Sequence, residues 1–205
     1  MRERELGIET ENWIEAEDLG LPQGGHCYEP ITYTAFDSII DHLDIDPERD
    51  VFVDYGCGKG RAVILAALQP FKRVIGVEYS KDLCDVAKKN LETVQSKVKA
   101  RSVEIVHCDA VEYELPAEAN VIYLWNPFKG SILDKVHEII ETSLRAHPRR
   151  MTIFSGVPQH EEDMLQGLSW LPEPFRLPTY YFTGVDVVVY EIPKPDFVKD
   201  SSSSS

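Results

Sequence analysis

Five short apolar runs recur between residues 50 and 155, and each is bounded by charged or turn-forming positions. Runs of this kind are typical of buried strands, which we expect at 51–55, 73–78, 103–108, 121–125 and 150–154. The segments between them are apolar at helical spacing or throughout, which predicts helices over 35–43, 62–68, 80–94 and 131–144. Strands that alternate with helices predict an α/β fold with a doubly wound, mainly parallel sheet.

Polar residues mark the ends of several of these helices. Thr34 and Asp37 have the spacing of a capping box at the start of the first helix, and Ser131 and Asp134 have it at the start of the last. Pro70 ends the second helix, because proline cannot continue the hydrogen-bond ladder.

The two ends of the chain depart from this pattern. Residues 1–30 have no sustained periodicity, and we interpret them as an N-terminal extension or lid ahead of a domain at 31–195. Residues 180–183 and 187–191 favour β structure and flank a short turn, which predicts an antiparallel C-terminal hairpin. The serine-rich residues 196–205 are predicted to be a disordered tail.

Composition limits the class of protein. With 205 residues, 43% apolar and 10% aromatic, the chain can fold as one domain. No stretch approaches the roughly 20 apolar residues of a membrane helix, and the charged start is unlike a secretory signal. Its cysteines, at 27, 57, 84 and 108, have no metal-ligand or disulfide-framework spacing. We therefore expect a soluble cytoplasmic protein with reduced thiols, no bound metal and no membrane contact.

The formal net charge of −14 is concentrated near the N-terminus, where residues 1–50 hold fourteen acidic residues and three arginines. Nucleic-acid binding generally requires a basic face, and only scattered lysines and arginines are present, which argues against a nucleic-acid partner. The acidic end is either a solvated surface or an attractive surface for a basic protein or polyamine.

The run at 51–55 leads into alternating glycines, in the order Asp54-x-Gly56-x-Gly58-x-Gly60. Glycines permit a sharp strand-to-helix turn in which backbone N–H groups face a ligand. The spacing differs from the dinucleotide fingerprint and from the Walker phosphate loop. Asp54 would repel a pyrophosphate and attract an ammonium group. Glu78 ends the next strand, 24 positions later, the spacing at which an acid reaches a ribose diol. An amino acid joined to a nucleoside describes S-adenosylmethionine.

With these features, residues 51–128 resemble the core of class I S-adenosylmethionine-dependent methyltransferases. Two further segments match: His107-Cys108-Asp109-Ala110 after the third strand and Asn126-Pro127-Phe128 after the fourth. Tyr28-Glu29-Pro30 ahead of a helix is similar to a group that includes protein-lysine methyltransferases. The resemblance implies a seven-stranded Rossmann-like fold with an antiparallel last strand, S-adenosylmethionine as cofactor, and methyl transfer.

The resemblance also implies a set of site residues, because the carboxyl ends of parallel strands converge at the switch point of such a sheet. We predict cofactor contacts from Asp54, Gly56, Cys57, Gly58, Gly60, Glu78, Tyr79, Asp109, Ala110 and Asn126. Glu78 would bind the ribose hydroxyls, and Asp109 with the Ala110 N–H would bind adenine. Asn126 would orient a substrate amine and Tyr28 would close over the cofactor, so both are candidate catalytic residues.

Each assignment has a structural alternative. Asp54 could order the loop by accepting from its N–H groups, Asn126 could only shape a turn, and Arg61 could pair with the cofactor carboxylate or be solvated. His26 and His160 are expected to be exposed loop residues rather than general bases. The acceptor is an amine or hydroxyl group, on a protein lysine or a small molecule. A non-catalytic S-adenosylmethionine-binding module and a nicotinamide oxidoreductase are the alternative functions, and neither the oligomeric state nor the acceptor is fixed.

Overall fold

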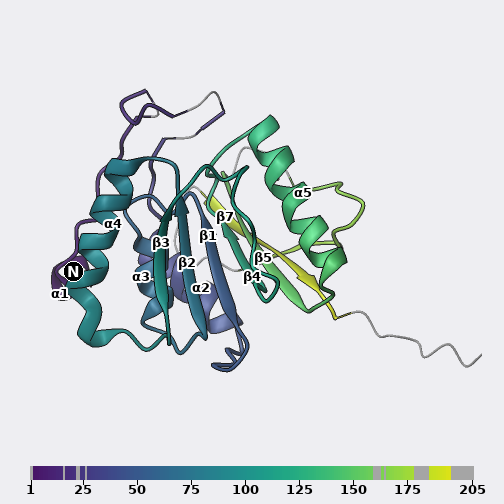
Figure 1. Ribbon diagram of the computed structural model, residues 1–205, viewed down its shortest axis with the longest axis horizontal. Coiled ribbons are helices and arrows are strands. Elements are labelled where there is room, and N and C mark those ends of the chain that lie inside the picture. Colours follow the sequence, from purple (N-terminus) through teal and green to yellow (C-terminus); the bar gives the residue numbers. More distant parts are fainter. Residues whose placement is uncertain are drawn as a thin grey trace, which may run out of the picture.

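A seven-stranded sheet in the order β3-β2-β1-β4-β5-β7-β6 forms the centre of the molecule (Figure 1). The structure is a computed structural model that describes residues 2–15, 17–21, 24–25, 27–158, 163, 165–177 and 185–194. The strands are β1 (Val51–Tyr55), β2 (Arg73–Glu78), β3 (Val103–His107), β4 (Val121–Leu124), β5 (Met151–Pro158), β6 (Phe175–Leu177) and β7 (Val185–Ile192). Strands β1 to β5 are parallel, and β7 is antiparallel to both β5 and β6. This confirms the predicted mainly parallel sheet with antiparallel C-terminal strands.

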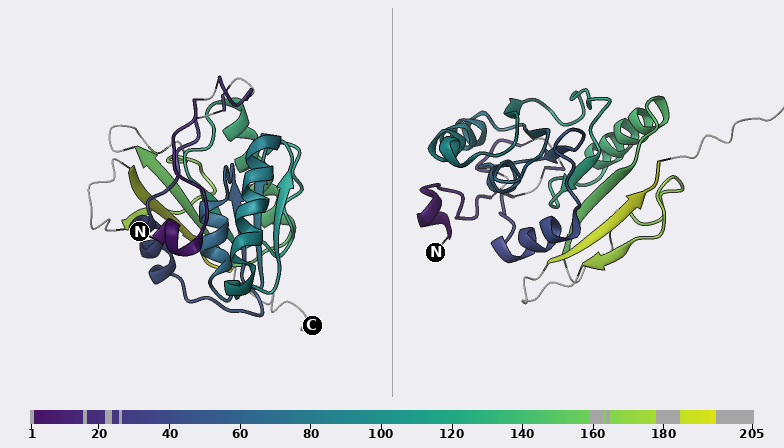
Figure 2. Two further views of the ribbon diagram at one scale, coloured as in Figure 1. Left: turned by 90° about the vertical axis from the view of Figure 1, so that its left-hand side faces the viewer. Right: turned by 90° about the horizontal axis from the view of Figure 1, so that it is seen from below.

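Helices cover both faces of this sheet (Figure 2). They are α1 (Arg2–Leu6), α2 (Tyr33–His42), α3 (Arg61–Ala67), α4 (Lys81–Val94) and α5 (Ser131–Ala146), with a short 3-10 helix, η1 (Gln95–Lys97). Successive strand residues point to opposite faces. Phe52 and Tyr123 accordingly share one core with α2, α3 and α4, whereas Val53 and Ile122 share the other with α5.

Three predicted elements are shifted along the chain. The N-cap of α5 is Gly130, which makes no side-chain cap bond, so Ser131 lies within that helix instead of capping it. The N-cap of α2 is Thr32, whose Oγ1 accepts from the Ala35 N–H at 3.3 Å, so Thr34 lies within the helix instead of capping it. In the C-terminal hairpin, β7 begins at Val185, which was expected in the turn but is buried, because β7 pairs with β5 along its whole length. Its other partner is β6, and the strand predicted at 180–183 lies outside the described residues.

The N-terminal segment packs against the domain. Ile8 is buried with Ile64 of α3 and Val94 of α4, and the Glu3 side chain is also buried. The predicted boundaries at residues 30 and 195 stay predictions, and the predicted tail at 196–205 lies outside the described residues, as do His26 and His160.

None of the helices in the described ranges has the length and hydropathy needed to cross a bilayer. The cysteines are all among the described residues, and no disulfide joins them. No cluster of metal-ligating side chains occurs among the described residues.

Candidate active site

A cavity opens at the carboxyl ends of β1, β2 and β4, with about 890 Å³ of empty space that includes solvent at its mouth. Most of the predicted site residues line it, namely Tyr28, Asp54, Gly56, Cys57, Gly58, Glu78, Tyr79, Asp109 and Ala110. Leu19, Leu21, Gly25 and residues 27–31 also line the cavity. The structure therefore brings the predicted strand-end residues together under part of the N-terminal segment.

The glycine loop makes a tight turn between β1 and α3. Gly58 has a φ of +55°, and a Cβ there would lie 2.3 Å from the Tyr28 ring, so the close approach requires glycine. Gly60, with a φ of +84°, is the N-cap of α3. A Cβ at Gly60 would lie 3.1 Å from Ala87 of α4. Gly60 does not line the cavity but packs against α4, and its contact with the cofactor stays a prediction.

Glu78 orders this loop. Its Oε2 accepts from the Gly58 N–H and its Oε1 accepts from the Ser80 N–H, both at 2.8 Å. Burial raises the pKa of Glu78, although these N–H groups act in the opposite direction. A carboxylate has about four lone-pair positions, so each oxygen can still accept from a ribose hydroxyl. Glu78 therefore fits its predicted ligand while fixing the loop that surrounds it.

Asp54 differs from Glu78 in having no hydrogen-bond partner within the described part of the chain. Its side chain is 2% exposed and lines the cavity. Burial, and then the charge of Glu78, raise its pKa well above the ordinary value of 3.8. The alternative in which Asp54 caps the loop is therefore not what the structure shows, because Glu78 does so. A buried carboxylate without a partner fits a cationic group such as the ammonium of S-adenosylmethionine.

The segment after β3 forms another wall. Asp109 Oδ1 accepts from the Val111 N–H at 3.1 Å, which turns the chain so that Asp109 and Ala110 both line the cavity. Tyr79 is 43% exposed and borders the same space. The arrangement suits an adenine ring, with the second oxygen of Asp109 available to accept from its amino group.

Tyr28 has a structural contact where a catalytic role was predicted. Its hydroxyl donates to the Thr10 carbonyl at 2.7 Å, and its ring packs on Gly58. Burial raises the pKa of Tyr28 further above its ordinary value. The hydroxyl is committed to a backbone carbonyl, whereas the residue lines the cavity, and its closure over the cofactor stays a prediction.

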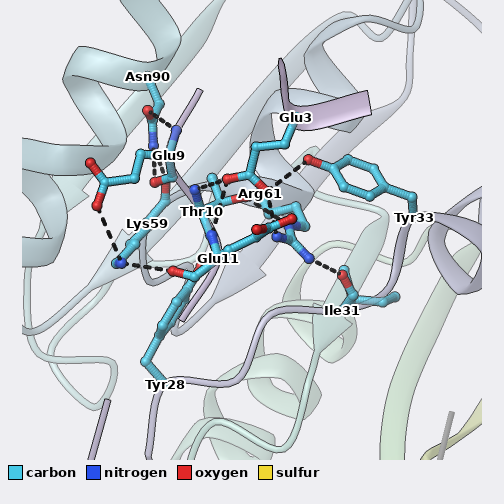
Figure 3. Close-up of polar contacts among 10 residues, drawn as sticks. All are labelled: Glu3, Glu9, Thr10, Glu11, Tyr28, Ile31, Tyr33, Lys59, Arg61 and Asn90. Atoms are coloured by element: carbon cyan, nitrogen blue, oxygen red, sulfur yellow. Dashed lines mark hydrogen bonds and ion pairs between the residues drawn. The ribbon is translucent and has the colours of Figure 1, made fainter. Parts of the chain in front are cut away.

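Arg61 binds the N-terminal segment, which corrects both predicted alternatives (Figure 3). Its Nη2 lies 3.0 Å from Glu3 Oε2 in a buried ion pair. Its Nε donates to Thr10 Oγ1 at 2.7 Å, and its Nη1 donates to the Ile31 carbonyl at 2.9 Å.

We term residues 2–12 the N-terminal strap. This strap makes further contacts with the glycine loop and with α4 (Figure 3). Lys59 Nζ donates to the Glu11 carbonyl at 2.9 Å. Asn90 Nδ2 donates to the Glu9 carbonyl at 2.9 Å and to the Lys59 carbonyl at 3.0 Å. The sequence reasoning missed this anchoring. The available signal was Arg61 itself, because a cation in the first turn of a helix is disfavoured unless it has an anionic partner.

Asn126 lies beside the cavity rather than in its wall. Trp125, Pro127 and Phe128 line the main cavity, whereas Asn126 lines a smaller one of about 230 Å³ with Ser155 and Gly156. Its φ is +47°, and its buried Oδ1 has no hydrogen-bond partner among the described residues. The structure therefore does not bring Asn126 into the wall of the main cavity with the other predicted site residues, and its contact with the cofactor stays a prediction.

Comparison with known proteins agrees with this geometry. The family model described as "Histone methylation protein DOT1" matches residues 24–142. A Dictyostelium discoideum protein named "Histone-lysine N-methyltransferase, H3 lysine-79 specific" is 33% identical over 103 residues, which are 45% of this chain. The chain spans only 6% of that relative's length.

Solved structures share the fold. An RNA methyltransferase from Salinibacter ruber, in complex with S-adenosyl-L-homocysteine, has a TM-score of 0.56 at 24% identity, over 82% of this chain and 95% of its own. M. jannaschii TYW2, in complex with AdoMet, has a TM-score of 0.53 at 18% identity, over 80% of this chain and 77% of its own. The family match, the sheet and the cavity together show that the chain belongs to the DOT1 family, with the fold of an S-adenosylmethionine-dependent methyltransferase.

Proposed function

We propose that this protein transfers the methyl group of S-adenosylmethionine to the side-chain amine of lysine in a basic protein. The family match supports methylation of a protein, and the name of the Dictyostelium relative supports lysine as the acceptor. The observation that carries the proposal is the partnerless carboxylate of Asp54, which shares its cavity with Glu78 and Asp109. These are the groups that the ammonium, ribose and adenine parts of the cofactor require.

The chain's own residues bind and align the reactants. When bound, S-adenosylmethionine supplies a methyl group on a positively charged sulfur. Asp54 holds the ammonium end, Glu78 the ribose and Asp109 the adenine, so the methyl position is fixed relative to the protein. Such positioning can contribute about 7–11 kcal/mol to lowering a barrier. No strong acid is needed, because the leaving sulfur becomes neutral.

The acceptor amine must be uncharged when it attacks the methyl group. Trp125, Pro127 and Phe128 form an apolar part of the cavity wall, against which the aliphatic stem of lysine can pack. Apolar surroundings lower the pKa of an entering ammonium group, which favours loss of its proton before transfer.

Charge near the cavity supports a basic protein as acceptor. Glu15, Glu17, Asp18 and Glu29 are exposed on the segment that also lines the cavity through Leu19 and Leu21. We further propose that the protein works in a reducing compartment such as the cytoplasm, since its cysteines form no disulfide.

The test is transfer of labelled methyl from S-adenosylmethionine to purified core histones, to unrelated lysine-rich proteins and to RNA. We expect label on protein lysines, located by mass spectrometry of peptides. The Glu78→Ala variant should lose transfer and weaken binding of S-adenosylhomocysteine in calorimetry. Label on RNA, or on a protein residue other than lysine, would overturn the acceptor assignment. Tight cofactor binding with no transfer to any acceptor would favour the non-catalytic module.

A further inference from the structure

Two tyrosine hydroxyls in neighbouring strands are buried without a hydrogen-bond partner among the described residues, those of Tyr55 in β1 and Tyr123 in β4. A buried polar group left unpaired costs about 1–3 kcal/mol, so each case calls for an explanation. Of the two, Tyr123 lines the main cavity and Tyr55 does not. The difference suggests that Tyr123 has a ligand as its partner.

The position of Tyr123 is tightly fixed. It pairs with Asp54 across the parallel β1–β4 ladder and is 2% exposed. Its ring is stacked with those of Phe52 and Trp125, at centroid distances of 5.8 and 6.1 Å, and meets Phe36 edge-on at 6.1 Å. A ring held by three aromatic neighbours keeps its hydroxyl in one region beside Asp54.

The charges around this hydroxyl are of both signs. Burial is the main cause that raises the pKa of Tyr123, the Asp54 carboxylate raises it further and the Arg61 guanidinium opposes the rise. The hydroxyl therefore stays protonated and can donate as well as accept. Because Arg61 is already paired with Glu3, the uncompensated charge beside this hydroxyl is that of Asp54, which is complementary to the ammonium group at the amino-acid end of S-adenosylmethionine.

We propose that the Tyr123 hydroxyl hydrogen-bonds to the amino-acid end of S-adenosylmethionine and positions it beside Asp54. The inference rests on the proposed function. Because neighbouring side chains cover the hydroxyl, contact requires small side-chain movements at the cavity wall, which binding sites commonly make. Tyr123 is a positioning residue, since it acts on the part of the cofactor away from the transferred methyl.

The experiment compares Tyr123→Phe with Tyr55→Phe, a matched control that removes the other partnerless hydroxyl. Calorimetry measures binding of S-adenosylhomocysteine and of 5′-deoxy-5′-methylthioadenosine, which keeps the nucleoside but lacks the amino-acid end. For Tyr123→Phe we expect S-adenosylhomocysteine to bind about 2- to 10-fold more weakly, the loss of one hydrogen bond, with unchanged binding of methylthioadenosine. For Tyr55→Phe we expect neither affinity to change.

Different results would contradict either the positioning role of Tyr123 or the proposed function. Equal weakening of both ligands by Tyr123→Phe, or no weakening of either, would overturn the positioning role. A similar loss in Tyr55→Phe would attribute the effect to general core packing. If the unmodified protein binds neither ligand, the proposed function itself fails. Ligand-free Tyr123→Phe should unfold no more easily than the unmodified protein, because the lost hydroxyl has no protein partner.

Discussion

Asp54 combines a cost to stability with a role in binding. Its carboxylate is buried, has no partner in the described structure and is repelled by Glu78, so its pKa is raised. A group of this kind favours the protonated folded state. The ligand-free protein therefore loses stability as pH rises above the ordinary value of 3.8, until the raised pKa of Asp54 has been passed.

From this we predict opposite effects of Asp54→Asn on stability and binding. At a pH of about 7.5, well above the ordinary carboxyl range, the ligand-free variant should have a higher melting temperature than the unmodified protein. The difference should shrink as pH falls toward 3.8. The stabilisation that S-adenosylhomocysteine gives should decrease, because the ammonium group loses its anionic partner. Differential scanning fluorimetry with and without ligand measures both effects, and a variant that melts lower at neutral pH would refute the argument.

The sequence predicted where the site residues lie better than it predicted their hydrogen-bond partners. Asp54, Glu78 and Asp109 line one cavity because strand ends converge in a parallel sheet. Which carboxylate accepts from the glycine loop depends on side-chain geometry between strands, and the structure gives Glu78 that role. The same applies to Asn126, whose backbone φ of +47° takes its side chain to a neighbouring cavity.

At the scale of elements, a buried ion pair is one of the contacts that attach the N-terminal strap to the domain. Glu3 and Arg61 have side chains only 10% and 8% exposed. Burial alone would raise the pKa of Glu3, but the Thr10 N–H and the Arg61 charge together lower it. Its contribution to stability is therefore present above the ordinary value of 4.5 and is lost as pH falls through the lowered pKa.

We expect Glu3→Gln to lower the free energy of unfolding by about 3 kcal/mol at neutral pH, since Arg61 would stay buried without a counter-charge. The matched control is Arg2→Gln, because Arg2 lies in α1 beside Glu3 and pairs with Asp37 of α2. That pair is 37% and 47% exposed, so its loss should cost less than about 1 kcal/mol. Urea unfolding measures both values. Equal costs for the two variants would show that the buried pair has no special role.

The strap and the C-terminal hairpin were the elements least accessible to sequence reasoning. Polar contacts from Glu3, Glu9 and Thr10 hold much of the strap, and such contacts leave no hydrophobic period. In the hairpin, Val185 and Asp186 follow a glycine, and the sequence therefore predicts a turn at these two residues. In the structure both belong to β7, because they pair with β5. The central strands and helices were predictable because continuous apolar runs mark the buried strands and apolar residues at helical spacing mark the helices.

At the scale of the molecule, the net charge of −14 should affect the encounter with an acceptor. Attraction between an acidic enzyme and a basic protein is screened by salt, whereas contacts inside a cavity are screened much less. We predict that raising ionic strength from about 0.05 to about 0.3 M lowers kcat/KM for a lysine-rich protein several-fold. The KM for S-adenosylmethionine should change little. An uncharged peptide acceptor serves as the control, and an equal salt effect on both acceptors would contradict the prediction.

The direction of β7 has a practical consequence. Its last residue, Ile192, pairs with Met151 at the start of β5, whereas the cavity opens at the carboxyl ends of β1, β2 and β4. Because β4 and β5 are parallel, Ile192 lies at the amino ends of the parallel strands, and the cavity lies at their carboxyl ends. A tether fused after β7 would therefore attach the protein to a sensor chip at the end of the sheet opposite the cavity. The cavity mouth would then stay accessible to ligands in the flow.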